Sequence, residues 1–227
     1  MITASGSAKA YGVLVQVAAR TEVGHVRSRN EDALLVAGEE RLVAVCDGLG
    51  GHPAGDLASA AAVESLRISA AKAAASPDGL VAAIHAAHEA VCAVAAEDPA
   101  RTGMATTVVV ATLGEGAARV AHVGDSRAYL LATDGRLHQV THDHGMGGYI
   151  TQALGLDRGV DPDVTVLQTP PGTRLLLCSD GLSNMLDAAS IGTLLGSGDA
   201  QAACDGLVEA ALDRGGIDNV TVVVVAL

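Results

Sequence analysis

The chain of 227 residues carries a formal net charge of −12, with no Trp, no Phe and only three Tyr. A protein this negative is a poor partner for nucleic acid or an anionic membrane, and the scarcity of aromatic rings argues against a stacking platform for bases. The length is sufficient for one domain with a substantial core, which Val, Leu, Ile and Ala must build.

Short apolar segments predict strands, and longer alanine-rich segments predict helices. The elements predicted before Pro99 are strands 12–18, 33–36 and 42–46, followed by helices 54–75 and 78–96. The elements predicted after it are strands 106–113, 119–123, 128–132, 164–167 and 174–178, helices 188–195 and 200–214, and strand 220–225.

The connections between the predicted strands indicate how the sheets are built. The segments TLGEGAAR and ATDGRL, residues 112–119 and 132–137, are typical of hairpin turns. Hairpins combined with helices in pairs predict antiparallel sheets carrying helices, an α+β fold without alternating βαβ units. Residues 11–227 are expected to form a single domain, and the small, polar residues 1–10 to be a disordered start.

Two further features concern the compartment of the protein. No uninterrupted apolar run is long enough to cross a membrane, and residues 1–11 lack the pattern of a signal peptide, so a cytoplasmic protein is expected. The cysteines lie far apart without a zinc-binding spacing, which predicts free thiols, mostly buried. They are Cys46, Cys92, Cys178 and Cys204.

Acidic residues recur where the predicted strands begin or end, most of them with a glycine nearby. These acids are Glu31, Asp32, Asp47, Asp125, Asp180 and Asp218. An aspartate in such a place commonly bonds nearby backbone amides, which would account for any single site. The repetition is harder to explain in that way, because Asn, Ser or Gly would serve equally well without concentrating negative charge.

Several carboxylates in one place are the ligands that Mg²⁺ and Mn²⁺ prefer. Two such cations bridged by one carboxylate lower the pKa of a shared water and hold the oxygens of a phosphoryl group. A glycine beside the acid lets a backbone carbonyl approach a cation. In the segment VAVCDGLGG we therefore expect Asp47 to bridge two cations and Gly48 to offer its carbonyl oxygen.

A site made of acids needs a cationic side chain if it is to hold a phosphate. In GHVRSRNED, Arg27 lies four residues before Glu31 and would share a face with it on an extended chain. A guanidinium binds phosphate oxygens in a bidentate way. Arg29 has the same parity, so the pattern alone does not choose between the two arginines.

Six motifs occur in order between about residues 17 and 225: VRSRNEDALLV, VAVCDGLGGHPAGDLAS, GMATTVVVATL, ARVAHVGDSRAYLL, LLLCSDGLSNML and GIDNVTVVVV. Together they resemble the metal-dependent protein serine/threonine phosphatases of type 2C, in their compact bacterial form. The resemblance implies a four-layer α-β-β-α sandwich, with two antiparallel sheets flanked by helix pairs. It also implies that a metal-bridged hydroxide hydrolyses phosphoserine and phosphothreonine on proteins, reversing a bacterial Ser/Thr kinase.

The resemblance assigns metal ligands residue by residue. Asp47 would bridge two Mn²⁺ or Mg²⁺ ions, and Gly48 would bind one of them through its carbonyl. Asp180 and Asp218 would each bind one ion, and Asp125 together with Asp180 resembles the pair that holds a third ion in bacterial members.

The resemblance also assigns residues around the metal ions. Glu31 and Asp32 would hold metal-bound waters, and Asn219 would support the loop next to Asp218. Arg27, and not Arg29, would meet the substrate phosphate.

Two further residues and one short connection carry expectations of their own. His52 is a possible general acid, although a hydrogen bond within its loop is the simpler expectation, and Arg127 is expected to anchor a strand through an ion pair. Only residues 146–149 connect THDHG with ITQALG, so the flap of bacterial relatives is nearly absent. The alternative function is a catalytically silent homologue that binds a phosphoprotein, which the complete set of acids argues against.

Overall fold

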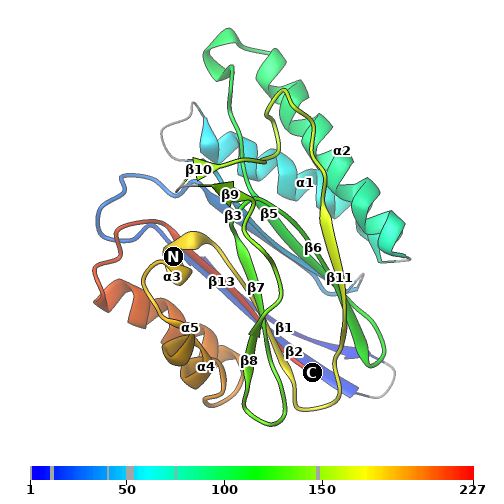
Figure 1. Cartoon of the computed structure of the whole chain (residues 1–227), viewed down its shortest axis with the longest axis vertical. Coiled ribbons are helices and arrows are strands. Elements are labelled where there is room, and N and C mark those ends of the chain that lie inside the picture. Colours follow the sequence, from blue (N-terminus) through cyan, green and yellow to red (C-terminus); the bar gives the residue numbers. More distant parts are fainter. Residues whose placement is uncertain (1, 11–12, 40, 50–53, 75, 147–148) are drawn as a thin grey trace.

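The computed structural model describes residues 2–10, 13–39, 41–49, 54–74, 76–146 and 149–227. Among these residues the strands form a six-stranded sheet, a five-stranded sheet and a two-stranded hairpin, all antiparallel. The two larger sheets face each other, and the long helices lie outside them (Figure 1). This is the four-layer α-β-β-α sandwich that the resemblance implies.

The six-stranded sheet has the order β1-β2-β13-β12-β7-β8. Its strands are β1 (Ile2–Ala10), β2 (Val13–Glu22), β7 (Arg127–Leu131), β8 (Leu137–Gln139), β12 (Arg174–Cys178) and β13 (Val220–Ala226). Its outer face packs against α3 (Asp180–Ser183), α4 (Ala188–Leu195) and α5 (Ala200–Asp213). Leu176 and Val224 of the sheet join Ile191 and Leu207 of the helices in one buried cluster.

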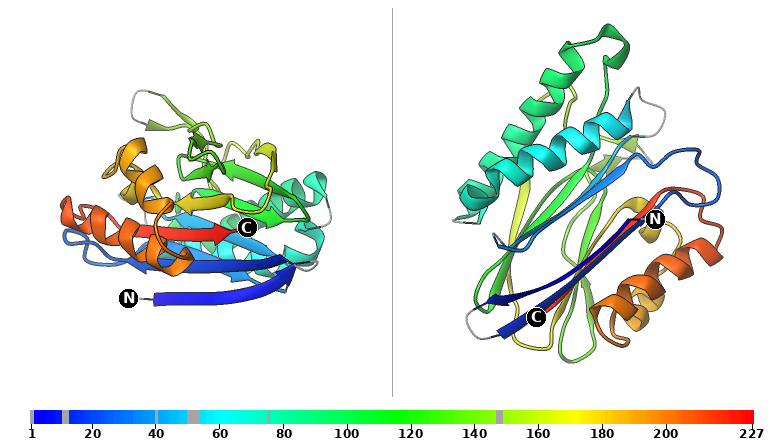
Figure 2. Two further views of the ribbon diagram at one scale, coloured as in Figure 1. Left: turned by 90° about the horizontal axis from the view of Figure 1, so that it is seen from below. Right: turned by 180° about the vertical axis from the view of Figure 1, so that it is seen from behind.

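The five-stranded sheet has the order β11-β6-β5-β4-β3. Its strands are β3 (Asp32–Ala37), β4 (Leu42–Asp47), β5 (Val108–Leu113), β6 (Ala117–Val123) and β11 (Asp163–Gln168). Helices α1 (Gly55–Ala73) and α2 (Pro77–Ala96) cover its outer face, followed by a short 3₁₀ helix at Pro99–Arg101 (Figure 2). The hairpin consists of β9 (Gly145–Met146) and β10 (Tyr149–Ile150).

Alternation along the strands places the functional end of the sandwich. In β4, Leu42 and Ala44 pack toward α1 and α2, whereas Val43 and Val45 belong to the core between the sheets. Since side chains alternate between faces, Asp47 continues the inner face. The apolar layer between the sheets therefore ends in polar residues at the strand ends that carry the acids.

Several elements differ from the sequence-based expectations. Residues 2–10, expected to be disordered, form edge strand β1, whose backbone pairs with β2 from Ile2 opposite Thr21 to Ala10 opposite Val13. Backbone hydrogen bonds at a sheet edge do not require an apolar sequence, so composition gave no sign of this strand. Strand β8, the hairpin β9–β10 and helix α3 were also missed. Residues 12 and 75, the ends of two predicted elements, lie outside the described residues.

Helix α2 is long and apolar enough to cross a membrane if only length and composition are considered. One face of it is buried against α1 and the five-stranded sheet through Leu80, Ile84 and Val91. The core helices of folded domains meet the same criterion, so this feature is weak support for a membrane span.

Candidate metal centre

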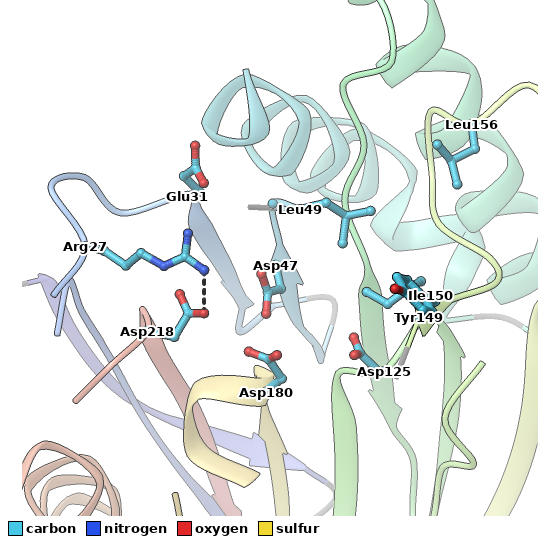
Figure 3. Close-up of a pocket in the computed structure, with 11 residues that line it drawn as sticks. Arg27, Glu31, Asp47, Leu49, Asp125, Tyr149, Ile150, Leu156, Asp180 and Asp218 are labelled. Carbon is cyan, nitrogen blue, oxygen red and sulfur yellow. Dashed lines mark hydrogen bonds and ion pairs between the residues drawn. The ribbon is translucent and has the colours of Figure 1, made fainter. Parts of the chain in front are cut away.

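Five carboxylates and one guanidinium line a cavity of about 440 Å³ at one end of the sandwich (Figure 3). The charged residues are Arg27, Glu31, Asp47, Asp125, Asp180 and Asp218. The remaining lining residues are Gly48, Leu49, Tyr149, Ile150 and Leu156. Among the predicted site residues, only Asp32 does not line the cavity, and it lies next to Asp47.

The two sheets bring the acids together from distant parts of the sequence. Asp47 ends β4, and Asp125 lies in the turn between β6 and β7. Asp180 follows β12, and Asp218 precedes the neighbouring strand β13. Between them, Gly181 packs so closely that a Cβ would collide with the backbone oxygen of Asn219. A glycine at this position is therefore what allows Asp180 and Asp218 to approach each other.

Asp32 is placed by the pairing of β3 with β4. It lies directly opposite Asp47 in the antiparallel register, so the two side chains project from the same face. Its Oδ2 atom accepts hydrogen bonds from Ser179 at 2.8 Å and from Thr221 at 2.6 Å. Its Oδ1 atom is buried and has no hydrogen-bond partner among the described residues.

The structure distinguishes the two arginines that the sequence pattern left equivalent. Arg27 lines the cavity and donates from Nη2 to Asp218 Oδ2 at 2.7 Å. Arg29 is not among the lining residues, and its Nη1 lies 3.8 Å from Asp56 Oδ2 in an exposed ion pair. Arg27 is thus the guanidinium positioned to meet an anion in the cavity.

Burial, together with the charges of neighbouring acids, raises the pKa of four carboxyl groups in the metal-free protein. Burial, and then the charges of neighbouring aspartates with Asp32 foremost, raise the pKa of Asp47 well above its usual value. Burial raises the pKa of Asp32 to about 7 and that of Asp125 to about 6, with further contributions from like charges. Burial and the charge of Asp218 raise the pKa of Asp180.

This donor set fits hard divalent cations. Every charged donor is a carboxylate oxygen, which Mg²⁺ and Mn²⁺ prefer, and bound cations would relieve the mutual repulsion that raises these pKa values. Gly48 packs so closely that a Cβ would collide with the backbone oxygens of Gly55 and Glu31, so only glycine fits beside Asp47. The buried, unpartnered Oδ1 atom of Asp32 is a further oxygen that a cation or its water would satisfy.

Hydrogen bonds around the cavity bear out two secondary expectations and reveal residues that the sequence did not single out. Asn219 accepts from the Glu31 backbone N–H at 2.8 Å and donates to the Arg29 carbonyl at 2.9 Å, so it supports the loop as expected. Arg127 forms the expected ion pair, with Asp143 at 2.6 Å. Ser179 and Thr221 were missed, although hydroxyl residues in otherwise apolar strand patterns were a usable signal.

A second group of potential metal ligands lies near the Asp125 turn. The ligand atoms of His122, His144 and Asp163 lie within 4.8 Å of one another. However, His144 Nδ1 accepts from the Gly124 N–H at 3.4 Å, so its Nε2 carries the proton that bonds Asp163 at 3.1 Å. This arrangement links the segment before the hairpin to the Asp125 turn.

Apolar residues form the side of the cavity opposite Arg27 (Figure 3). They are Leu49, Tyr149, Ile150 and Leu156. Two of them, Tyr149 and Ile150, belong to the hairpin β9–β10. This hairpin has only two residues in each strand and occupies the position of the shortened flap. His52 and residues 147–148 lie outside the described residues.

Comparisons with known proteins agree with this geometry. The family model described as Protein phosphatase 2C matches residues 22–206. Serine/threonine protein phosphatase PstP of Mycobacterium tuberculosis is 35% identical over 93% of this chain, which spans 45% of that protein. Serine/threonine phosphatase stp of Listeria innocua is 32% identical over 91% of this chain and 93% of that protein.

A comparison with a solved structure shows that the fold is shared as well. The catalytic domain of PstP in complex with two manganese ions has a TM-score of 0.83 and 35% sequence identity, over 93% of this chain and 97% of that one. The family match covers the segments that carry Asp47, Asp125 and Asp180, and the solved structure extends over 93% of this chain. The chain therefore belongs to the protein phosphatase 2C family.

Proposed function

We propose that this chain is a metal-dependent phosphatase that removes phosphate from serine and threonine residues of proteins. The observation that carries the proposal is the cavity itself, where four aspartates and Glu31 face Arg27. The acids are suited to cations, and the guanidinium to a phosphate. All the acids expected from the resemblance are present around the cavity, which argues against a catalytically silent homologue.

The residues divide into those that hold cations and those that hold substrate. Asp47, Gly48, Asp180 and Asp218 would hold two Mn²⁺ or Mg²⁺ ions, and Asp125 with Asp180 a third. Bound cations would supply a nucleophile at neutral pH by lowering the pKa of water, and would neutralise charge on the phosphoryl group.

The remaining polar residues orient what the cations hold. Arg27 would bind phosphate oxygens through a bidentate pair of hydrogen bonds. Glu31 and Asp32 would accept hydrogen bonds from waters around the cations and so fix their orientation. The two manganese ions in the PstP structure support two ions here, although either Mn²⁺ or Mg²⁺ suits the oxygen ligands.

The proposed substrates are proteins phosphorylated by a bacterial serine/threonine kinase, in the cytoplasm. The names of the bacterial relatives support the substrate class. The four cysteines are free, which suits a reducing compartment.

Hydrolysis of an aryl phosphate and of a phosphothreonine peptide tests the proposal. The purified protein is treated with a chelator, and Mn²⁺, Mg²⁺ or Ca²⁺ is then added back. We expect activity to vanish with chelation and to return with Mn²⁺ far better than with Ca²⁺, because Ca²⁺ prefers looser, higher coordination. Full activity in the metal-free protein would contradict the proposal.

A further inference from the structure

We propose that Ser179 and Thr221 are positioning residues of the metal centre. Their hydroxyl groups hold one oxygen of Asp32, so that the other oxygen is presented to the cations or their waters. This inference rests on the proposed metal-dependent function and deepens it, because it explains how a carboxylate beside Asp47 is kept in one orientation.

The two oxygens of Asp32 have different surroundings. Oδ2 accepts from Ser179 Oγ at 2.8 Å and from Thr221 Oγ1 at 2.6 Å. Oδ1 is buried without a hydrogen-bond partner among the described residues, an unfavourable state for a carboxylate oxygen unless something else satisfies it. Since Asp32 lies directly opposite Asp47 on β4, the metal centre is the neighbour that can do so.

The directions of these hydrogen bonds are fixed by neighbouring groups. Thr221 gives its single hydroxyl proton to Asp32, so the Thr21 hydroxyl 2.6 Å away must donate to Thr221. The Thr21 oxygen accepts in turn from Asn30 Nδ2 at 2.7 Å. Ser179 Oγ accepts from the Thr221 backbone N–H at 3.0 Å, which leaves its own proton for Asp32. Both donors are therefore held pointing at Oδ2.

The positions of these hydroxyls argue against a role in packing alone. Ser179, Thr221 and Thr21 are buried, and each lies two residues from an apolar inner-face residue, of β12, β13 and β2 respectively. The preceding or following inner-face positions are apolar, such as Leu177 and Val223. Apolar side chains at the three positions would avoid burying polar groups. The Asp32 carboxylate, to which Ser179 and Thr221 donate, explains why hydroxyl groups are buried here.

The test measures Mn²⁺ binding to the metal-free protein by titration calorimetry, which does not depend on turnover. Ser179→Ala and Thr221→Val each remove one donor to Asp32. We expect each to weaken Mn²⁺ binding by about 10-fold or more, the usual range for loss of a group that orients a ligand. Thr221→Ser keeps the hydroxyl and is expected to restore affinity to within about 3-fold of the wild type.

Thr112→Val is the matched control. It removes a buried hydroxyl that has no hydrogen-bond partner among the described residues, opposite Leu42 at the other end of β4 from Asp47, and leaves both donors to Asp32 in place. We expect its Mn²⁺ affinity to stay within about 3-fold of the wild type, even where its melting temperature falls. Melting curves of all metal-free variants show which of them are folded.

A double-mutant comparison tests whether the hydroxyls act through Asp32. In an Asp32→Asn background, Thr221→Val is expected to change Mn²⁺ affinity much less than in the wild type, because the group it orients is already altered. Wild-type affinity in both folded Ser179→Ala and Thr221→Val would overturn this inference alone, as would an equal effect of Thr221→Val in the two backgrounds. A wild-type protein that binds no Mn²⁺ would overturn the proposed function as well.

Discussion

Asp47 has four other aspartates as electrostatic neighbours: Asp32, Asp125, Asp180 and Asp218. Burial and the charges of neighbouring aspartates all disfavour its ionised form when no cation is bound. The same crowding that is unfavourable in the metal-free protein favours binding of divalent cations, since a bound ion converts repulsion into attraction. A neutral side chain at this position should therefore leave the metal-free protein at least as stable while lowering its activity.

The variant Asp47→Asn makes this test. We expect the melting temperature of the metal-free protein to stay equal or rise, while kcat falls by about 1,000-fold, because Asp47 as the proposed bridging ligand would stabilise the transition state by several kcal/mol. Asp143→Asn is the contrasting control, since it breaks the 2.6 Å ion pair with Arg127 and should lower the melting temperature. Near-wild-type turnover in Asp47→Asn would show that Asp47 is not the bridge.

Arg27 and Arg29 provide a second test at the scale of single residues. Arg27→Ala is expected to raise KM for a phosphopeptide by about 10- to 100-fold, because a hydrogen bond to a charged group contributes about 1.5–3 kcal/mol. Arg29→Ala removes only an exposed ion pair and should change KM by less than about 3-fold. Steady-state kinetics with the opposite ranking would reassign the phosphate-binding arginine.

The sequence allowed the acids to be predicted, but not what orients them. Asp47, Asp180 and Asp218 stand beside glycines or strand ends, a local pattern that can be read along the chain. The contacts of Asp32 join residues 147 and 189 positions apart, and such pairs follow only from the pairing of strands. The choice of Arg27 over Arg29 came from the resemblance, because loop conformation and not strand parity places the guanidinium.

At the scale of elements, the predictions succeeded where a segment is buried by its own pattern. Helix α4 has the predicted bounds Ala188–Leu195, and the all-buried strand β5 was predicted to within two residues. Strand β1 and the hairpin β9–β10 were missed because they depend on backbone pairing with a neighbour, which leaves little trace in composition. The four-residue helix α3 is too short for a periodic signal.

The hairpin β9–β10 leads to a prediction about substrate selection. Its Met146 and Tyr149 are 77% and 80% exposed, so they have few contacts with the rest of the chain that would fix them against a peptide. We expect kcat/KM over a panel of phosphopeptides, compared with a small aryl phosphate, to vary within about two decades. A spread of four decades or more would show that strong contacts with residues around the phosphate exist.

At the scale of the whole molecule, the apolar layer between the sheets ends in a group of partly buried acids. The raised pKa values of Asp32, at about 7, and of Asp47 mean that the folded metal-free protein holds protons that the unfolded chain releases near pH 4. Stability then falls as pH rises toward the folded pKa values, because the folded state binds more protons. Burial lowers the pKa of His88 and His122, which gives the opposite slope below about pH 6.5.

From pH 6.5 to 8 the contribution of the histidines fades, because the unfolded chain loses its histidine protons, and the carboxyl groups dominate. We expect the melting temperature of the metal-free protein to fall across this interval, since each such group contributes a slope of up to about 1.4 kcal/mol per pH unit between its unfolded and folded pKa values and little above the folded one. Asp32→Asn removes one of these groups and should make the decline shallower. Saturating Mn²⁺ should raise the melting temperature most at pH 8. At that pH the carboxylate ligands are ionised, and Mn²⁺ binds the folded state alone. A melting temperature that is constant or rises with pH in the metal-free wild type would show that folding does not raise the pKa values of these acids.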